Sequence, residues 1–274
     1  MTIAQQTIAS ALGVTSHFNA EEEAHRRVVF LKEYLRNLSC HAYVLGISGG
    51  VDSLTAGMLA QSAVSQLRED GYQARFIAVR LPYGVQADEK DAQMALDVIQ
   101  PDRVVTADIK PASDAIWDAL AADGADLIDI KTRHFHLGNI KARQRMIAQY
   151  GLAGAVRGLV IGTDQAAEAL MGFFTKFGDG AADILPLAGL TKRRVRAIAA
   201  AMGAPSELVY KVPTADLESD APLRPDEQVF GVTYDEIDDF LEGKAIRAEA
   251  EERILAFYRG SEHKRRLPVT PLVD

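Results

Sequence analysis

Short apolar runs alternate along this chain with stretches whose apolar residues recur every three or four positions. The apolar run over 42–47 is followed by a Gly-rich turn and then by an amphipathic stretch over 54–67. A continuous apolar run is typical of a strand buried on both faces of a parallel sheet, and the three-four spacing is typical of a helix. The alternation predicts a doubly wound, Rossmann-like α/β fold, in which one parallel sheet carries helices on both faces.

The same alternation continues through the rest of the chain. We predict further strands at 76–79, 104–105 and 159–161, and helices at 24–38, 92–99, 115–120, 141–150, 164–171, 191–202 and 246–258. Connections this regular favour a single domain over residues 1–274. The apolar stripe on 24–38 fits an intramolecular core and a subunit interface equally well. Two segments rich in turn-forming residues, 82–88 and 204–231, are expected to be mobile loops.

Composition excludes several classes of protein. The net charge is −8, which argues against a nucleic-acid partner because such a partner usually needs a basic face. No apolar run approaches the roughly 20 residues of a membrane helix, and no basic segment precedes an apolar one as in a signal peptide. A single cysteine, Cys40, excludes an intramolecular disulfide and a cysteine-rich metal site. We therefore expect a cytoplasmic protein with no membrane partner.

The turn after the first apolar run is the segment most informative about function; it reads Gly46-Ile47-Ser48-Gly49-Gly50-Val51-Asp52-Ser53. Glycines let backbone N–H groups close around an anion, and the two serines add hydroxyl donors. The dipole of the following helix also favours negative charge at this point. Because ligands of open α/β sheets bind outside the carboxyl ends of the strands, the turn predicts a phosphate site.

Asp52 is the unusual member of this turn. A Walker A loop would carry Lys after its second glycine, and the G-x-G-x-x-G pattern of dinucleotide-binding turns is absent. An acid beside a phosphate would repel the ligand, unless the carboxylate holds Mg²⁺, which bridges carboxylate and phosphate oxygens. The alternative is a tight strand-to-helix turn in which Asp52 caps the helix.

Segments along nearly the whole chain resemble one family. The turn 48–53 resembles the pyrophosphate loop of ATP pyrophosphatases that adenylate their substrates. Eight more segments, each weak alone but highly specific together, resemble the ammonia-dependent NAD synthetases within that superfamily; they are residues 80–84, 138–146, 162–168, 172–180, 190–193, 213–217, 234–239 and 262–265.

This resemblance implies a reaction in two steps. ATP adenylates the nicotinic acid carboxylate of deamido-NAD and releases pyrophosphate, and ammonia then attacks the acyl adenylate to give NAD and AMP. Charge develops on phosphate, so such a protein is expected to supply cations and fixed donors rather than a nucleophile. Mg²⁺ is the implied cofactor, and ATP is the co-substrate.

The resemblance also implies the residues of the ATP site. Asp52 and Glu168 would hold Mg²⁺ and, with Lys192, act in catalysis. The implied ATP contacts are Gly46, Ile47, Ser48, Gly49, Gly50, Val51, Asp52, Ser53, Arg80, Thr163, Lys192 and Thr214. Simpler alternatives exist for three of these positions: Thr163 as a helix N-cap, Arg80 as a solvated strand end, and Glu168 as an exposed helix acid. Lys192 at a helix start opposes the helix dipole, and a bound phosphate would offset that cost.

For deamido-NAD the resemblance implies Arg143, Lys176, Asp183, His263 and Lys264. In the family this site lies at the interface of a homodimer, and Arg143, His263 and Lys264 would come from the neighbouring chain. On charge alone, residues 264–266 would instead form a solvated basic tail. Phe173 and Phe174 fit either a ring contact or the core.

The chain departs from the family pattern at Gln165, where many members have His, and at Val51 and Phe177. None of these departures removes an implied phosphate or metal ligand. Two other functions stay open from the residues. One is another adenylating pyrophosphatase, such as a tRNA-modifying or amidotransferase-coupled ligase. The other is a nucleotide-binding module without activity.

Overall fold

The computed structural model describes residues 1–85, 88–124, 126–215 and 224–271. Its main sheet is parallel, with strands β1 (Ala42–Gly46), β2 (Arg75–Arg80), β3 (Arg103–Thr106) and β4 (Gly158–Val160) in the order β3-β2-β1-β4. The chain moves from β1 outward to β3 and then returns to the other side of β1. The strand order therefore reverses between β1 and β4, which is where open α/β sheets form a ligand crevice.

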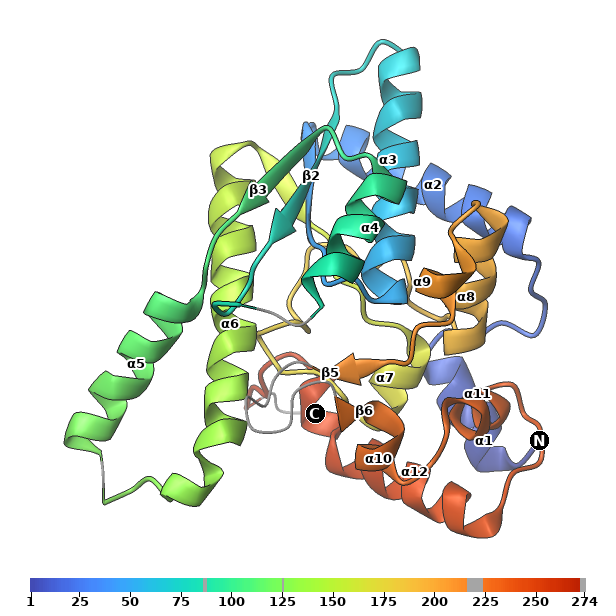
Figure 1. The fold of residues 1–274 in the computed structure, drawn as a ribbon. Helices are drawn as coiled ribbons and strands as arrows, with labels where there is room; N and C mark the ends of the chain where they lie inside the picture. Colours follow the sequence, from blue (N-terminus) through green and yellow to red (C-terminus); the bar gives the residue numbers. More distant parts are fainter. Residues whose placement is uncertain (86–87, 125, 216–223, 272–274) are drawn as a thin grey trace.

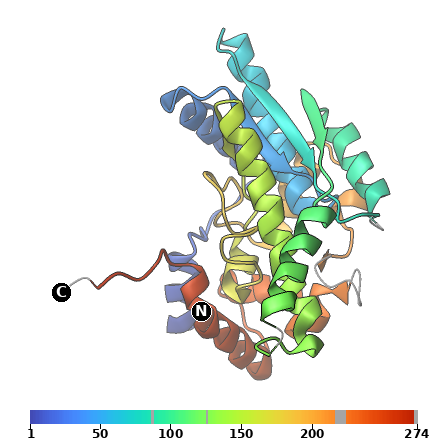
Figure 2. The same cartoon turned by 90° about the vertical axis from the view of Figure 1, so that its left-hand side faces the viewer.

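Each face of the sheet is covered by helices, as the alternation predicted. Tyr43 and Leu45 pack with α2 (Ala20–Asn37), α3 (Val51–Glu69), α4 (Glu89–Ile99) and α8 (Lys192–Ala201). Ala42 and Val44, which point to the opposite face, pack with α6 (Arg133–Ala155) and with Ile109 before α5 (Lys110–Asp123). Figures 1 and 2 show α6 along one face and α3 along the other. The predicted doubly wound α/β fold is confirmed.

A second, smaller core lies beyond the carboxyl ends of the strands (Figure 1). It joins α1 (Ile3–Ala11), α7 (Ala166–Met171), α10 (Asp226–Phe230), α11 (Tyr234–Leu241) and α12 (Ala248–Gly260). Short 3₁₀ helices lie at Ile130–Thr132 and Glu262–Lys264. Because this core faces the carboxyl ends of the sheet, its helices can supply side chains to a site there.

The apolar stripe predicted on 24–38 belongs to the intramolecular core. Ala24, Val28, Leu31 and Leu35 are buried against α3 and α8, whereas Leu38 is half exposed. None of the helices in the described ranges has the length and apolar character needed to cross a membrane.

Several boundaries differ from the sequence predictions; α5 and α6, for example, are longer than the helices predicted at 115–120 and 141–150. Residues 204–231, expected to be a loop, contain α9 (Ser206–Val209), β5 (Thr214–Ala215), β6 (Arg224–Pro225) and α10. Elements this short are missed because they carry no full period of an apolar pattern. The helix expected from Asp164 begins later, because Gln165 is the N-cap: its side-chain oxygen accepts from the N–H groups of Ala167 and Glu168. Residues 86–87 and 216–223 of the two predicted loops lie outside the described part.

Candidate active site

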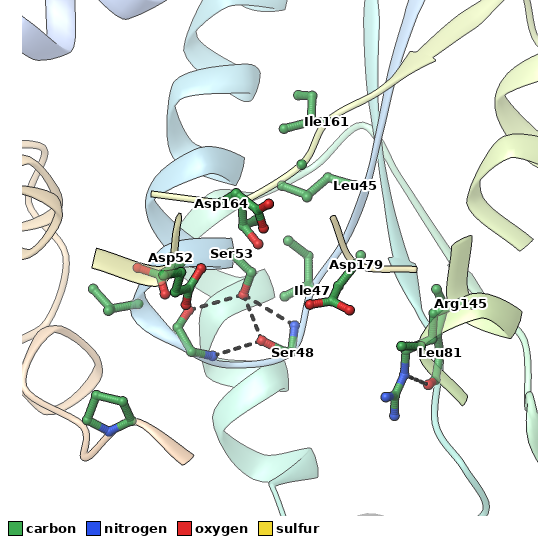
Figure 3. A pocket seen from close by; sticks show the side chains of 18 of the residues that line it. Leu45, Ile47, Ser48, Asp52, Ser53, Leu81, Arg145, Ile161, Asp164 and Asp179 are labelled. Atoms are coloured by element: carbon green, nitrogen blue, oxygen red, sulfur yellow. Dashed lines mark hydrogen bonds between the residues drawn. The ribbon is translucent and has the colours of Figure 1, made fainter. Parts of the chain in front are cut away.

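The turn between β1 and α3 is held by its own serines (Figure 3). Ser53 Oγ donates to the Gly50 carbonyl at 3.1 Å and lies 3.1 Å from Ser48 Oγ. The Gly50 N–H donates to Ser48 Oγ at 3.3 Å, and the Ser48 N–H donates to Ser53 Oγ at the same distance. In this structure the hydroxyls shape the turn and take up the Ser48 and Gly50 N–H groups, so a ligand would meet the other backbone N–H groups of the turn at the N-terminus of α3.

Gly49 is required by both conformation and space. Its φ is +84°, in the left-handed region that side chains rarely adopt. A Cβ at this position would lie 2.6 Å from the Ala92 backbone nitrogen and 2.9 Å from the Asp91 carbonyl carbon. The turn is therefore pressed against the first turn of α4.

A cavity of about 320 Å³ opens at the carboxyl ends of β1, β2 and β4. The predicted ATP-site residues that line it are Gly46, Ile47, Ser48, Gly50, Val51, Asp52, Ser53, Arg80, Thr163, Glu168 and Lys192. Gly49 instead faces α4. The Thr214 side chain lies outside the described residues. The fold thus brings together positions from four separate segments of the sequence.

Lys192 and Asp52 form an ion pair inside this cavity. Lys192 Nζ lies 2.5 Å from Asp52 Oδ2, and the two side chains are 3% and 15% exposed. Burial lowers the pKa of Lys192, but the carboxylates of Asp52 and Glu168 outweigh it and raise the pKa above its ordinary value. Lys192 is therefore a fixed positive charge at neutral pH.

Acidic groups outnumber this cation. Burial, followed by the charge of Asp52, raises the pKa of Glu168 well above its ordinary value, while Lys192 opposes the shift. Burial, with Asp179 and Asp52, raises the pKa of Asp164 to about 7. Burial also raises the pKa of Asp226. Carboxyl groups also outnumber the basic side chains in the lining of the whole cavity, and such a surplus favours a site that takes up a cation.

The donor set fits Mg²⁺. Asp52 Oδ1 and Asp226 Oδ1 are buried and have no hydrogen-bond partner among the described residues. The described residues contain no group of three side chains already arranged as metal ligands. Mg²⁺ commonly takes only one or two protein carboxylates and completes its shell with phosphate oxygens and water. Asp52 and Glu168, the two predicted ligands, both line the cavity.

One interpretation of the sequence was that the Arg80 side chain is exposed to solvent at the end of a strand, and the structure contradicts it. Arg80 is 4% exposed and donates to the Ile47 carbonyl and, at 2.7 Å, to Glu89 Oε2. Its guanidinium therefore connects the segment after β1 to α4 at the wall of the cavity.

The five predicted deamido-NAD residues lie outside the lining of this cavity. Arg143 donates to the Lys176 carbonyl at 3.2 Å, and Lys176 Nζ donates to the His263 carbonyl at 2.6 Å. Lys264 Nζ donates to two carbonyls, those of Gly172 and Phe174, each at 2.9 Å. One chain thus gathers these four residues on a common surface. The fifth, Asp183, accepts from the Val160 N–H at 2.7 Å at the end of β4.

Lys264 and Arg265 do not belong to the free basic tail that charge alone suggested for 264–266, whereas Arg266 is exposed and pairs with Glu262. Besides the contacts of Lys264, Arg265 donates to the Ala169 carbonyl at 3.0 Å and to Ser261 Oγ at 2.7 Å. Of the two adjacent aromatics, Phe174 is buried, and Phe173 both lines the cavity and packs edge-on against Phe230.

Residues 23–268 match the family model described as NAD synthase. The chain belongs to the NAD synthase family. It is 62% identical to an NH(3)-dependent NAD(+) synthetase of Burkholderia cenocepacia strain HI2424, over 97% of this chain and 94% of that protein. Similarity on this scale confirms the resemblance and disfavours both a tRNA-modifying ligase and an inactive module.

Solved structures agree with the family assignment. The crystal structure of NAD+ synthetase from Burkholderia pseudomallei matches with a TM-score of 0.84 and 57% identity, over 97% of both chains. NMN synthetase from Francisella tularensis matches with a TM-score of 0.81 and 36% identity, over 93% of this chain and 99% of that one. The same fold therefore serves two differently named synthetases.

Several cavity residues of this NAD synthase family member were not predicted. Asp164 and Asp179 lie within the resembling segments 162–168 and 172–180, so a signal was present. Gln149 Oε1 accepts from the Gly46 N–H at 2.7 Å, where the end of β1 has lost its β4 neighbour. Asp226 follows a Pro-rich segment and carried no local pattern.

Proposed function

We propose that this chain catalyses the amidation of deamido-NAD by ammonia, with ATP cleaved to AMP and pyrophosphate through an NAD-adenylate. This is the last step of NAD biosynthesis. The observation that carries the proposal is the Lys192–Asp52 pair beside Glu168 at the end of a phosphate-type turn. The chain that carries this pair is 62% identical to an NH(3)-dependent NAD(+) synthetase over 97% of its length.

In the first step the chain binds and orients ATP. Backbone N–H groups of the turn and the positive end of α3 meet the phosphates. Lys192 holds its proton because nearby carboxylates raise its pKa, so it acts as a fixed charge rather than as an acid. Asp52 and Glu168 would hold Mg²⁺, which neutralises charge on the leaving pyrophosphate when bound.

In the second step ammonia attacks the acyl carbon and AMP leaves. The ammonium group of Lys192 stabilises the negative charge that develops on the phosphate of AMP as AMP leaves.

We propose that Arg143, Lys176, Asp183, His263 and Lys264 bind deamido-NAD at the interface of a homodimer. Arg143 is exposed on α6 beside the exposed side chain of Ile147. Beyond Lys264 the chain leaves the body of the molecule (Figure 2) and carries Leu267 and Val269, which are 85% and 94% exposed. Exposed apolar side chains next to the predicted ligand residues support a contact with a second copy.

A mixing experiment tests whether the site is shared. Asp52→Asn and Arg143→Ala variants are each expected to be inactive. If Arg143 serves the partner's nucleotide site, each mixed dimer contains one intact site out of two. Because about half of the dimers are mixed after subunit exchange in a 1:1 mixture, that mixture is expected to recover about a quarter of wild-type activity. No recovery after proven subunit exchange would place Arg143 and Asp52 in the same chain's site.

The reaction itself is tested with ATP, Mg²⁺, ammonium and deamido-NAD. NAD and AMP are expected in equal amounts, and ADP in place of AMP would overturn the proposed chemistry. Nicotinic acid mononucleotide is assayed in parallel, because a relative 36% identical is named NMN synthetase. A higher kcat/KM for the mononucleotide would overturn the substrate assignment while leaving the adenylation chemistry in place. The cytoplasmic location expected from the sequence remains a prediction.

A further inference from the structure

The segment 234–239 resembles the family but has no role in the proposed reaction. In the structure it forms most of α11, and this helix packs beside the N-terminus of α8, where Lys192 is the first helical residue. Two residues of α11 contact Lys192, and they lie four positions apart, so they share one face of the helix.

The first contact is to the backbone. Thr191, the N-cap of α8, makes no side-chain cap hydrogen bond within the described part of the chain; its hydroxyl lies 3.3 Å from Glu242 Oε1. Asp238 supplies the cap instead. Its Oδ1 accepts from the Lys192 N–H at 3.0 Å, its Oδ2 accepts from the Arg193 N–H at 2.7 Å, and it is 1% exposed. The position of the Lys192 backbone is therefore fixed by a buried carboxylate of another helix.

The second contact is to the side chain. Lys192 Nζ lies 5.0 Å from the centroid of the Tyr234 ring, within the range of a cation–π contact. Tyr234 is itself held at two points: its hydroxyl donates to Asp226 Oδ2 at 2.9 Å, and its backbone N–H donates to Glu227 Oε1 at 2.8 Å. The ammonium group is thus placed between the Tyr234 ring and Asp52.

We infer that α11 positions Lys192 for phosphate chemistry, with Asp238 fixing its backbone and the Tyr234 ring fixing its ammonium group. The inference rests on the proposed function, in which Lys192 faces the phosphates. Tyr234 and Asp238 are positioning residues. A small displacement of a charge aimed at a transition state lowers kcat more than it weakens ground-state binding.

Four variants test this inference. In Asp238→Asn, the side-chain amide puts a donor against one of the two backbone N–H groups, and Tyr234→Leu removes the ring. Both are expected to lower kcat about tenfold to a hundredfold while the KM for ATP changes little. Tyr234→Phe keeps the ring and is expected to stay near wild-type kcat. Asp239→Asn is the matched control, because Asp239 pairs with the side chains of Arg193 and Lys244.

A second measurement reports on Lys192 without any turnover. Acylation of Lys192 by acetic anhydride, followed by peptide mass spectrometry, is expected to be faster in Asp238→Asn and Tyr234→Leu than in wild type and in the two other variants. Circular dichroism and thermal melting identify variants that fold. If Asp238→Asn does not fold, the comparison of Tyr234→Leu with Tyr234→Phe decides.

Unchanged kcat and unchanged Lys192 acylation in a folded Tyr234→Leu or Asp238→Asn variant would overturn the inference. The inference would also be overturned if a lower melting temperature were the sole effect of these two substitutions. If the wild-type protein makes no AMP, the proposed function fails, and the acylation rates then decide separately whether α11 positions Lys192.

Discussion

Lys192 Nζ and Asp52 Oδ2 lie 2.5 Å apart, although the residues are 140 positions apart in the sequence. Asp52 stands in the first turn of α3 and Lys192 in the first turn of α8, so the N-termini of two helices converge on the cavity. Both helix ends favour an anion between them. A carboxylate and an ammonium at that point give the site one group for a metal ion and one for a phosphate.

Replacing Asp52 by Asn is expected to abolish AMP formation, with a loss of at least about a hundredfold, because it removes both the partner of Lys192 and a proposed Mg²⁺ ligand. The fold is expected to stay intact, as judged by circular dichroism. Asp70→Asn, at the other end of α3, is the control, because its ion pairs with Lys32 and Arg36 lie at the surface. Full turnover by Asp52→Asn would remove the metal role.

Gly49→Ala is expected to destabilise the protein by about 3 kcal/mol, since it combines left-handed strain with a clash against Ala92. Gly71→Ala is a matched control: Gly71 has φ of +80°, yet a Cβ there would meet nothing within 4 Å. Its expected cost is about 1 kcal/mol. Urea unfolding measures both, and equal losses would show that the contact with α4 contributes nothing.

The carboxyl of Asp164 is expected to make stability fall as pH rises from about 4 to about 7. Burial, with Asp179 and Asp52, raises its pKa from 3.8 to about 7 in the folded protein. Within that window the folded state holds a proton that the unfolded state has lost, so each step up in pH favours unfolding. Asp164→Asn cannot titrate and is therefore expected to melt at a higher temperature than wild type above pH 7.

Melting curves between pH 4 and pH 8 test this prediction. Asp108→Asn serves as a control of opposite sign, because hydrogen bonds from the Gly84 and Lys110 N–H groups lower the pKa of Asp108. That variant is expected to be less stable than wild type near neutral pH. A constant difference between Asp164→Asn and wild type at every pH would contradict the assignment.

Lys176→Ala is expected to raise the KM for deamido-NAD about tenfold and to leave the KM for ATP nearly unchanged, because a charged contact to the dinucleotide is lost. Steady-state kinetics with each substrate varied in turn measures the two values. Lys32→Ala, on the outer helix α2, controls for the loss of a lysine. An equal change in both KM values would place Lys176 elsewhere.

The sequence was sufficient for the parts of the fold that rest on local periodicity. The four strands of the main sheet and the long helices follow from apolar spacing, since each buries a regular face. The helices α9 and α10 have four and five residues, too few for a periodic signal. Helix α11, with eight, was found only as a resembling segment and was not assigned a conformation.

The site divides in the same way. The turn 46–53 was predicted from its own residues, because glycines between a strand and a helix have a direct physical meaning. That Asp52 meets Lys192 depends on how α3 and α8 pack, which no local pattern encodes; the resemblance alone placed them together. Asp226 and the cap from Asp238 were missed, since their roles come from contacts with distant segments.

The cap of α8 by Asp238 has a consequence for how the protein is made. Translation delivers the phosphate turn early and Lys192 much later, and the carboxylate that fixes Lys192 emerges later still. A ribosome-bound chain that ends before α11 therefore contains the turn 46–53 but lacks the Asp238 carboxylate that fixes the Lys192 backbone. On the inference above, Lys192 is held in its working position only once α11 has been synthesised and has packed against α8.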